Sequence, residues 1–183
     1  MFGCVPYRGY FSKTTAISTA RELEQEGLDV YVSGVTAYST LGWSSDPLLS
    51  TMFAGDKTYL AALVFHELAH QRVYVNDDTA FNEAFAVAVE TTGVRTWLRA
   101  AGDEAGLRRY EAGLRRSADF VGLVARTRSE LARTYAGPDS AEGKRAAKSA
   151  AIEQLRSRYR HMRDTRWGGY SGFDSWFEAP ISN

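Results

Sequence analysis

The chain has 183 residues, of which 44% are hydrophobic and 13% aromatic, so it can bury one sizeable core. Its 22 basic and 22 acidic side chains cancel, which excludes an overall electrostatic attraction to nucleic acid or to an anionic membrane. We therefore expect one soluble domain over residues 1–183. Its expected parts are an N-terminal region (1–55), a metal-binding helix pair (56–99) and a C-terminal helical region (100–183).

The N-terminal region predicts one helix, one strand and one loop. Residues 13–26 have the spacing of an amphipathic helix that ends at Gly27, and residues 28–32 carry the β-branched and aromatic side chains typical of a strand. Residues 34–42 are rich in Gly, Ser and Thr, which predicts a loop or an edge strand beside a cleft. The expected fold class is therefore α+β, with helices predominating.

The most informative segment is the sequence HELAH at residues 66–70. Residues 59–65 lead into it without Gly or Pro, and Asp56 is the expected N-cap, so the segment lies in a helix too short to span a bilayer. Residues four apart share a helix face, so both histidines can bind one zinc ion. Glu67, between them, is the expected base beside that ion.

A third protein ligand is needed, because a catalytic zinc site usually has three and keeps a position for water. Turn residues at 76–79 precede a second predicted helix over 81–97, and Glu83 lies in its first turn. A short connection makes the two helices antiparallel neighbours. We therefore predict that Glu83 lies near His70 and is the third ligand.

Two further residues could take part in the metal site. His161 is the only other histidine and the main rival of Glu83, but it lies in the basic stretch 156–166, where a solvated helix surface explains it. Glu90 shares a helix face with Glu83 and could be the hydrogen-bond partner of a metal-binding histidine. We favour an ordinary surface carboxylate for Glu90.

The C-terminal region predicts two long charged helices, at about residues 104–135 and 140–163, joined at 137–138. A partial apolar stripe indicates an antiparallel hairpin that packs on the catalytic core. Acidic residues alternate with the arginines, which favours a solvated surface over nucleic-acid binding. The aromatic tail at 167–177 is expected to cover a core, with the rim of a pocket as the alternative.

Five segments of the chain together resemble the bacterial putative aminopeptidase family. They are residues 3–11, 37–43, 46–50, 66–71 and 78–86, with HELAHQ and FNEAFA as the most specific parts. The resemblance implies a zincin-like metallopeptidase core of the gluzincin type. In it, His66, His70 and Glu83 would bind Zn²⁺ and Glu67 would act as base.

The same resemblance gives expectations about the length of the protein and its cellular compartment. Family members are longer at both ends and begin with a secretory or lipoprotein signal, so we expect this chain to be truncated at both ends. The family implies the bacterial cell envelope or periplasm. Residues 1–3 carry no signal sequence, which leaves the cytoplasm as the alternative.

The expected reaction is hydrolysis of a peptide substrate. Glu67 would take a proton from the attacking water and pass it to the leaving amine. Tyr38 is the favoured donor to the oxyanion, and the alternatives are Tyr74, Tyr159, Tyr170 and His161. An aminopeptidase also needs a carboxylate for the free amine of its substrate, and the candidates are Asp46, Asp77 and Asp78. A zinc endopeptidase and a non-catalytic zinc-binding scaffold remain alternative functions.

Overall fold

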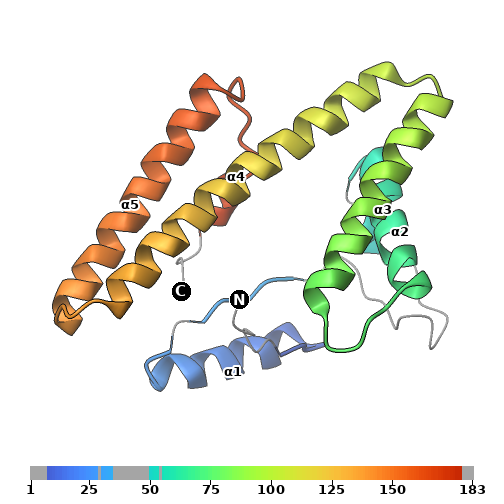
Figure 1. The fold of residues 1–183 in the computed structure, drawn as a ribbon. Helices are drawn as coiled ribbons and strands as arrows, with labels where there is room; N and C mark the ends of the chain where they lie inside the picture. The colour runs from blue at the N-terminus through green and yellow to red at the C-terminus, as the bar shows by residue number, and fades with distance from the viewer. Residues whose placement is uncertain (1–7, 29, 35–49, 54, 179–183) are drawn as a thin grey trace. The chain divides into compact units, whose positions relative to one another are not determined.

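The computed structural model describes residues 8–28, 30–34, 50–53 and 55–178. Its elements are helices, shown in Figure 1: α1 (Lys13–Gln25), the 3₁₀ turn η1 (Ser50–Phe53), α2 (Lys57–Arg72), α3 (Thr79–Ala100), α4 (Glu104–Ala136), α5 (Ala141–Thr165) and the 3₁₀ turn η2 (Asp174–Phe177). None of the helices in these ranges is long and apolar enough to cross a membrane.

The chain divides into two compact units. Gly34–Ser117 forms one, which we call the α2–α3 unit, and Met1–Ser33 with Ala118–Asn183 forms the other, which we call the α5 unit. Helix α4 contributes its residues up to Ser117 to the α2–α3 unit and the remainder to the α5 unit.

The predicted α+β fold class is wrong, because the described residues form five α-helices and no strand. The expected strand at 28–32 is irregular at each of its described positions, and Tyr31 and Val32 there are exposed. A strand is stable only when a neighbouring strand takes up its backbone N–H and C=O groups. β-Branched and aromatic composition therefore does not suffice to make one. Most of the expected loop at 34–42 lies outside the described residues.

Helix α1 ends where the sequence predicts. Gly27 has φ +83°, the left-handed conformation that glycine adopts without a steric penalty. The amide of Leu28 then donates to the carbonyl of Leu23 at 3.1 Å, the long-range bond of a Schellman motif. Gly27 therefore ends the helix by satisfying carbonyls that would otherwise lack partners.

Side-chain caps start both helices of the α2–α3 unit. Asp56 accepts hydrogen bonds from the amides of Thr58 (3.0 Å) and Tyr59 (2.9 Å), which confirms it as the N-cap of α2. Asp78 accepts from the amide of Phe81 at 3.0 Å and caps α3 in the same way. The two caps set where the helices begin and thus the register of the residues between them.

The core of this unit lies where α2, α3 and the first turns of α4 meet. Val94, Leu98 and Leu107 are buried there, and Phe65 and Tyr110 pack against them. Gly93 lets α2 and α3 approach closely, because a β-carbon at this position would lie 2.8 Å from the Phe65 ring. The first part of α4 therefore packs on the helices that carry the candidate metal ligands.

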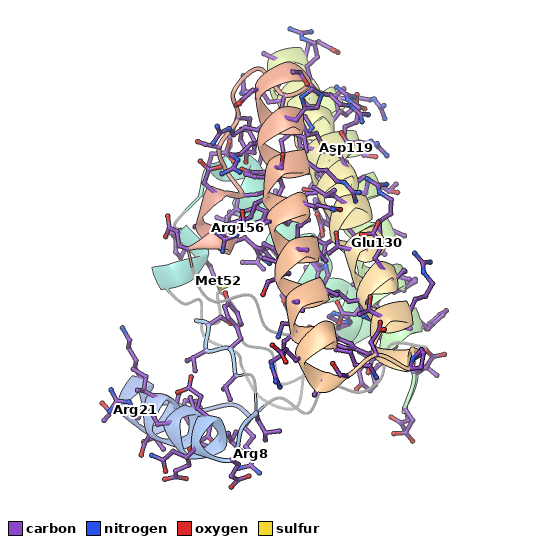
Figure 2. The ribbon with its side chains drawn as sticks, turned by 90° about the vertical axis from the view of Figure 1, so that its left-hand side faces the viewer. Arg8, Arg21, Met52, Asp119, Glu130 and Arg156 are labelled. Carbon is purple, nitrogen blue, oxygen red and sulfur yellow. The ribbon has the colours of Figure 1, made fainter. Side chains whose placement is uncertain are left out.

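The predicted helical hairpin is present in the α5 unit, where α5 lies beside the second part of α4 (Figure 1). Ser140 caps α5 by accepting from the amide of Gly143 at 3.1 Å. Charged side chains project from both helices of the hairpin, among them Glu130 from α4 and Arg156 from α5 (Figure 2). Glu130 pairs with Arg158 at 3.3 Å, as expected for a solvated helix surface.

The aromatic tail covers the core of the hairpin, as the sequence predicts. The buried residues of this core are Phe120, Leu123, Leu155, Tyr159 and Trp167. Phe173 from the tail stacks on Phe120 with ring centres 4.4 Å apart. The indole N–H of Trp167 donates to Asp119 at 3.1 Å, which satisfies the polar atom of this buried ring.

Candidate metal centre

Helices α2 and α3 run antiparallel, and their contacts place the candidate ligands together. Position 65 on α2 faces position 93 on α3, position 66 faces 90, and position 70 faces 83, so the numbering rises on one helix as it falls on the other. The short connection between the two helices produces this arrangement, as predicted. Glu83 therefore lies opposite the histidines of α2.

His66, His70 and Glu83 converge. Nε2 of His66 lies 3.4 Å from Oε2 of Glu83, and Nε2 of His70 lies 3.6 Å from Oε1 of the same carboxylate. One candidate ligand atom from each residue lies within 4.8 Å of the other two, so the three form a group that could hold a metal ion. The imidazole rings are edge to face with centres 5.0 Å apart, which lets two Nε2 atoms approach one point without overlap of the rings.

The environments of the three side chains differ. The side chain of His70 is 10% exposed and that of His66 is 21% exposed, whereas that of Glu83 is 56% exposed. The histidines are therefore surrounded by protein, and the carboxylate borders solvent, from which an ion can enter. Nδ1 of His70 is buried and has no hydrogen-bond partner among the described residues.

His66 has a second carboxylate on its other ring nitrogen. Nδ1 of His66 lies 3.2 Å from Oε2 of Glu90, and the hydroxyl of Tyr110 donates to Oε1 of Glu90 at 3.2 Å. The side chain of Glu90 is only 22% exposed, so the surface interpretation that the sequence favoured is wrong and the alternative, a partner of a histidine, describes the geometry. Burial and the negative charge of Glu90 raise the pKa of Tyr110.

The connection between α2 and α3 is held by Asn82, the residue before Glu83. Its amide oxygen accepts from the backbone N–H of Val75, and its amide nitrogen donates to the carbonyl of Val75, both at 2.8 Å. Asp77 in the same turn has φ +61°, a left-handed conformation that Asp tolerates better than most residues. These contacts determine where α3 starts relative to α2.

Glu67 is half-buried on α2 and makes no hydrogen bond or ion pair with the described part of the chain. Residues three apart share a helix face, so Glu67 borders the face that carries His70. Its carboxylate is therefore available for proton transfer.

The remaining candidates lie in different environments. His161 is exposed on α5 in the other unit and is not part of the converging group. Tyr159 is buried in the core of the α5 unit, where it donates to Asp174, while Tyr74 and Tyr170 are exposed. Tyr38, the favoured oxyanion donor, and Asp46 lie outside the described residues.

Tyr110 contacts Glu90 through its hydroxyl, which the sequence did not reveal. Tyr110 lies in the apolar stripe of the first part of α4, so its sequence position indicated only packing in the core. The available signal was chemical: a tyrosine buried in a helix stripe needs a partner for its hydroxyl. Only the packing of α4 on α3 identifies that partner as Glu90.

Two histidines one helical turn apart and a carboxylate from the next helix define a helical protein with a candidate metal centre of the HExxH type. The complete chain, residues 1–183, matches the family described as "Putative aminopeptidase", and the chain belongs to that family. Comparison with curated proteins gives no match, and neither does comparison with solved structures.

Proposed function

We propose that the chain is a zinc-dependent aminopeptidase in which His66, His70 and Glu83 hold the ion. The observation that carries this proposal is the approach of both Nε2 atoms to Glu83, at 3.4 and 3.6 Å. Ligand atoms about 2.0–2.1 Å from a tetrahedral zinc lie about 3.3 Å from one another. The two distances to Glu83 are close to this value, and the three ligand atoms, which lie within 4.8 Å of one another, would move together to hold the ion. When bound, zinc supplies a Lewis acid that polarises a carbonyl and lowers the pKa of water.

Glu67 is the proposed general base. Glu67 follows His66 in the sequence, and its carboxylate makes no hydrogen bond or ion pair with the described residues. It can therefore accept the proton of the water that attacks the peptide carbonyl. The same carboxyl group then donates this proton to the leaving amine. Tyr38 stays the proposed donor to the developing oxyanion.

Aminopeptidase action needs a carboxylate for the substrate's free amine, and we assign Asp77 to this role. Asp78 is occupied in capping α3, whereas Asp77 is exposed in the turn between the two ligand-bearing helices. The family to which the chain belongs supports a peptide as the substrate.

The metal site is tested by elemental analysis of the purified chain and its variants. We expect one zinc per chain in the wild type and none in Glu83→Ala. The control is His161→Ala, which removes a side chain of a metal-binding type from α5 and should retain the zinc. Zinc retained by Glu83→Ala would exclude this residue as a ligand.

Activity is tested with a peptide pool in two forms, one with free and one with acetylated amino termini. Amino acids released only from the free peptides, and no longer released by Glu67→Gln, would support an aminopeptidase. Cleavage of both forms would indicate an endopeptidase. Zinc without cleavage of either form would indicate a non-catalytic metal-binding protein.

A further inference from the structure

The two ring nitrogens of His66 face different carboxylates. Nε2 lies 3.4 Å from Glu83, and Nδ1 lies 3.2 Å from Glu90. Of these two contacts, the one with Glu90 has hydrogen-bond geometry, and a carboxylate oxygen accepts such a bond when Nδ1 carries the proton. In a neutral ring with its proton on Nδ1, the Nε2 atom toward Glu83 is unprotonated, which is the form that binds a metal ion.

The carboxylate of Glu90 is itself held from a third helix. The Tyr110 hydroxyl on α4 donates to Oε1 of Glu90 at 3.2 Å, and Oε2 is left to face His66. The ring of Tyr110 packs against the buried core of Val94, Leu98 and Leu107. A tyrosine hydroxyl is protonated at neutral pH and can therefore donate, and burial beside Glu90 raises the pKa of Tyr110 further above that range.

We propose that Glu90 and Tyr110 are positioning residues of the metal centre, in which Tyr110 orients Glu90 and Glu90 holds His66 as the Nδ1–H tautomer with Nε2 directed at the ion. The proposal rests on the proposed function in one respect, that Nε2 of His66 is a metal ligand. It assigns α4 a part in a site whose ligands come from α2 and α3. Partners of this kind commonly change metal affinity by about 10- to 100-fold.

The first test is Zn²⁺ affinity, measured by competition with a chromophoric chelator on the full chain. We expect Glu90→Gln to weaken binding by about 10- to 100-fold. Tyr110→Phe, which removes one hydrogen bond, should weaken it by about 2- to 10-fold. The matched controls are Glu111→Gln, a half-buried carboxylate next to Tyr110 on α4, and Tyr31→Phe, an exposed tyrosine. Both controls should bind as the wild type does.

A double variant separates a positioning role from a packing role. If Tyr110 acts through Glu90, then Tyr110→Phe has no further effect on Zn²⁺ affinity once Glu90→Gln is present. Losses that multiply in the double variant would overturn the link between the two residues. Circular dichroism of each variant verifies that it is folded.

The second test needs no metal. NMR of isotope-labelled histidine reports the tautomer directly, and the chain has only 3 histidines to assign. The spectra are recorded at alkaline pH on the Glu83→Ala variant, which lacks the carboxylate opposite Nε2 of His66. We expect the Nδ1–H tautomer at His66, lost when Glu90→Gln is added.

The outcomes are distinguishable. An Nε2–H tautomer at His66, or unchanged Zn²⁺ affinity in Glu90→Gln, would overturn the positioning role. A wild-type chain that binds no Zn²⁺ but shows the Nδ1–H tautomer would overturn the proposed function while keeping the contact of Glu90 with His66.

Discussion

The side-chain amide of Asn82 is bonded at both ends to the backbone of Val75, with two hydrogen bonds of 2.8 Å. Asn82 is 2% exposed, and it is adjacent to Glu83 in the sequence. The pair therefore ties the middle of the α2–α3 connection to the turn of α3 that carries a candidate metal ligand. Loss of this tie would change both stability and the position of Glu83.

Replacing Asn82 tests this role. We expect Asn82→Ala to lower the free energy of unfolding by about 1–3 kcal/mol, because two hydrogen bonds to the backbone of Val75 are lost at about 0.5–1.5 kcal/mol each, and to weaken Zn²⁺ binding. Chemical denaturation and chelator competition measure the two effects. The control is Asn76→Ala, an exposed asparagine in the same connection that should change neither value. Wild-type stability in Asn82→Ala would contradict the role.

The close approach of α2 and α3 at Gly93 makes a second prediction. A β-carbon there would lie 2.8 Å from the Phe65 ring, so Gly93→Ala should destabilise the protein by about 1–3 kcal/mol through overpacking. Gly113 on α4 has no atom within 4 Å of its β-carbon position, so Gly113→Ala should instead stabilise by up to about 1 kcal/mol. Thermal unfolding compares the two variants. Equal effects would mean that Gly93 does not determine the helix spacing.

Tyr159 makes stability depend on pH in the alkaline range. Burial, and then its hydrogen bond to Asp174, raise the pKa of Tyr159 from 10.0 to about 12. The folded state therefore holds this proton more tightly than the unfolded state. The resulting stabilisation is complete below pH 10 and is lost as the pH rises from 10 through about 12.

The measurement is the free energy of unfolding across this range, for the wild type and for Tyr159→Phe. The variant lacks the ionisable group, so its curve should fall less steeply. Tyr74→Phe, at an exposed position, should retain the wild-type slope. Identical slopes for all three proteins would show that Tyr159 titrates normally.

The division into two units predicts different consequences for two equivalent core substitutions. Leu98 is 0% exposed in the α2–α3 unit and Leu155 is 1% exposed in the α5 unit. Leu98→Ala and Leu155→Ala should each lower stability by about 2–5 kcal/mol, because each leaves a cavity. Folded Leu155→Ala should nevertheless bind Zn²⁺ as the wild type does, since all three candidate ligands lie in the other unit. Chelator competition on the folded variants decides this.

The sequence predictions are accurate where the stabilising contacts are close in the sequence, and they fail where the contacts are distant in the sequence. Asp56 and Gly27 were predicted correctly because a helix cap is formed within about four residues of chain. The strand at 28–32 was predicted wrongly because its stability needs a partner strand, which residue composition does not report. Glu90 was ranked as a surface carboxylate for a similar reason. Its contacts, to His66 and Tyr110, span 24 and 20 residues of chain.

By itself, the sequence predicted the five α-helices, the common helix face of His66 and His70 and the position of Glu83 near His70, because helical spacing and a short connection constrain these positions locally. Only the tertiary structure decided that Glu90 faces His66 and that Tyr110 on α4 holds Glu90. Those contacts depend on the packing of three helices around Phe65 and Gly93, and such packing follows from the shapes of side chains that are distant in sequence.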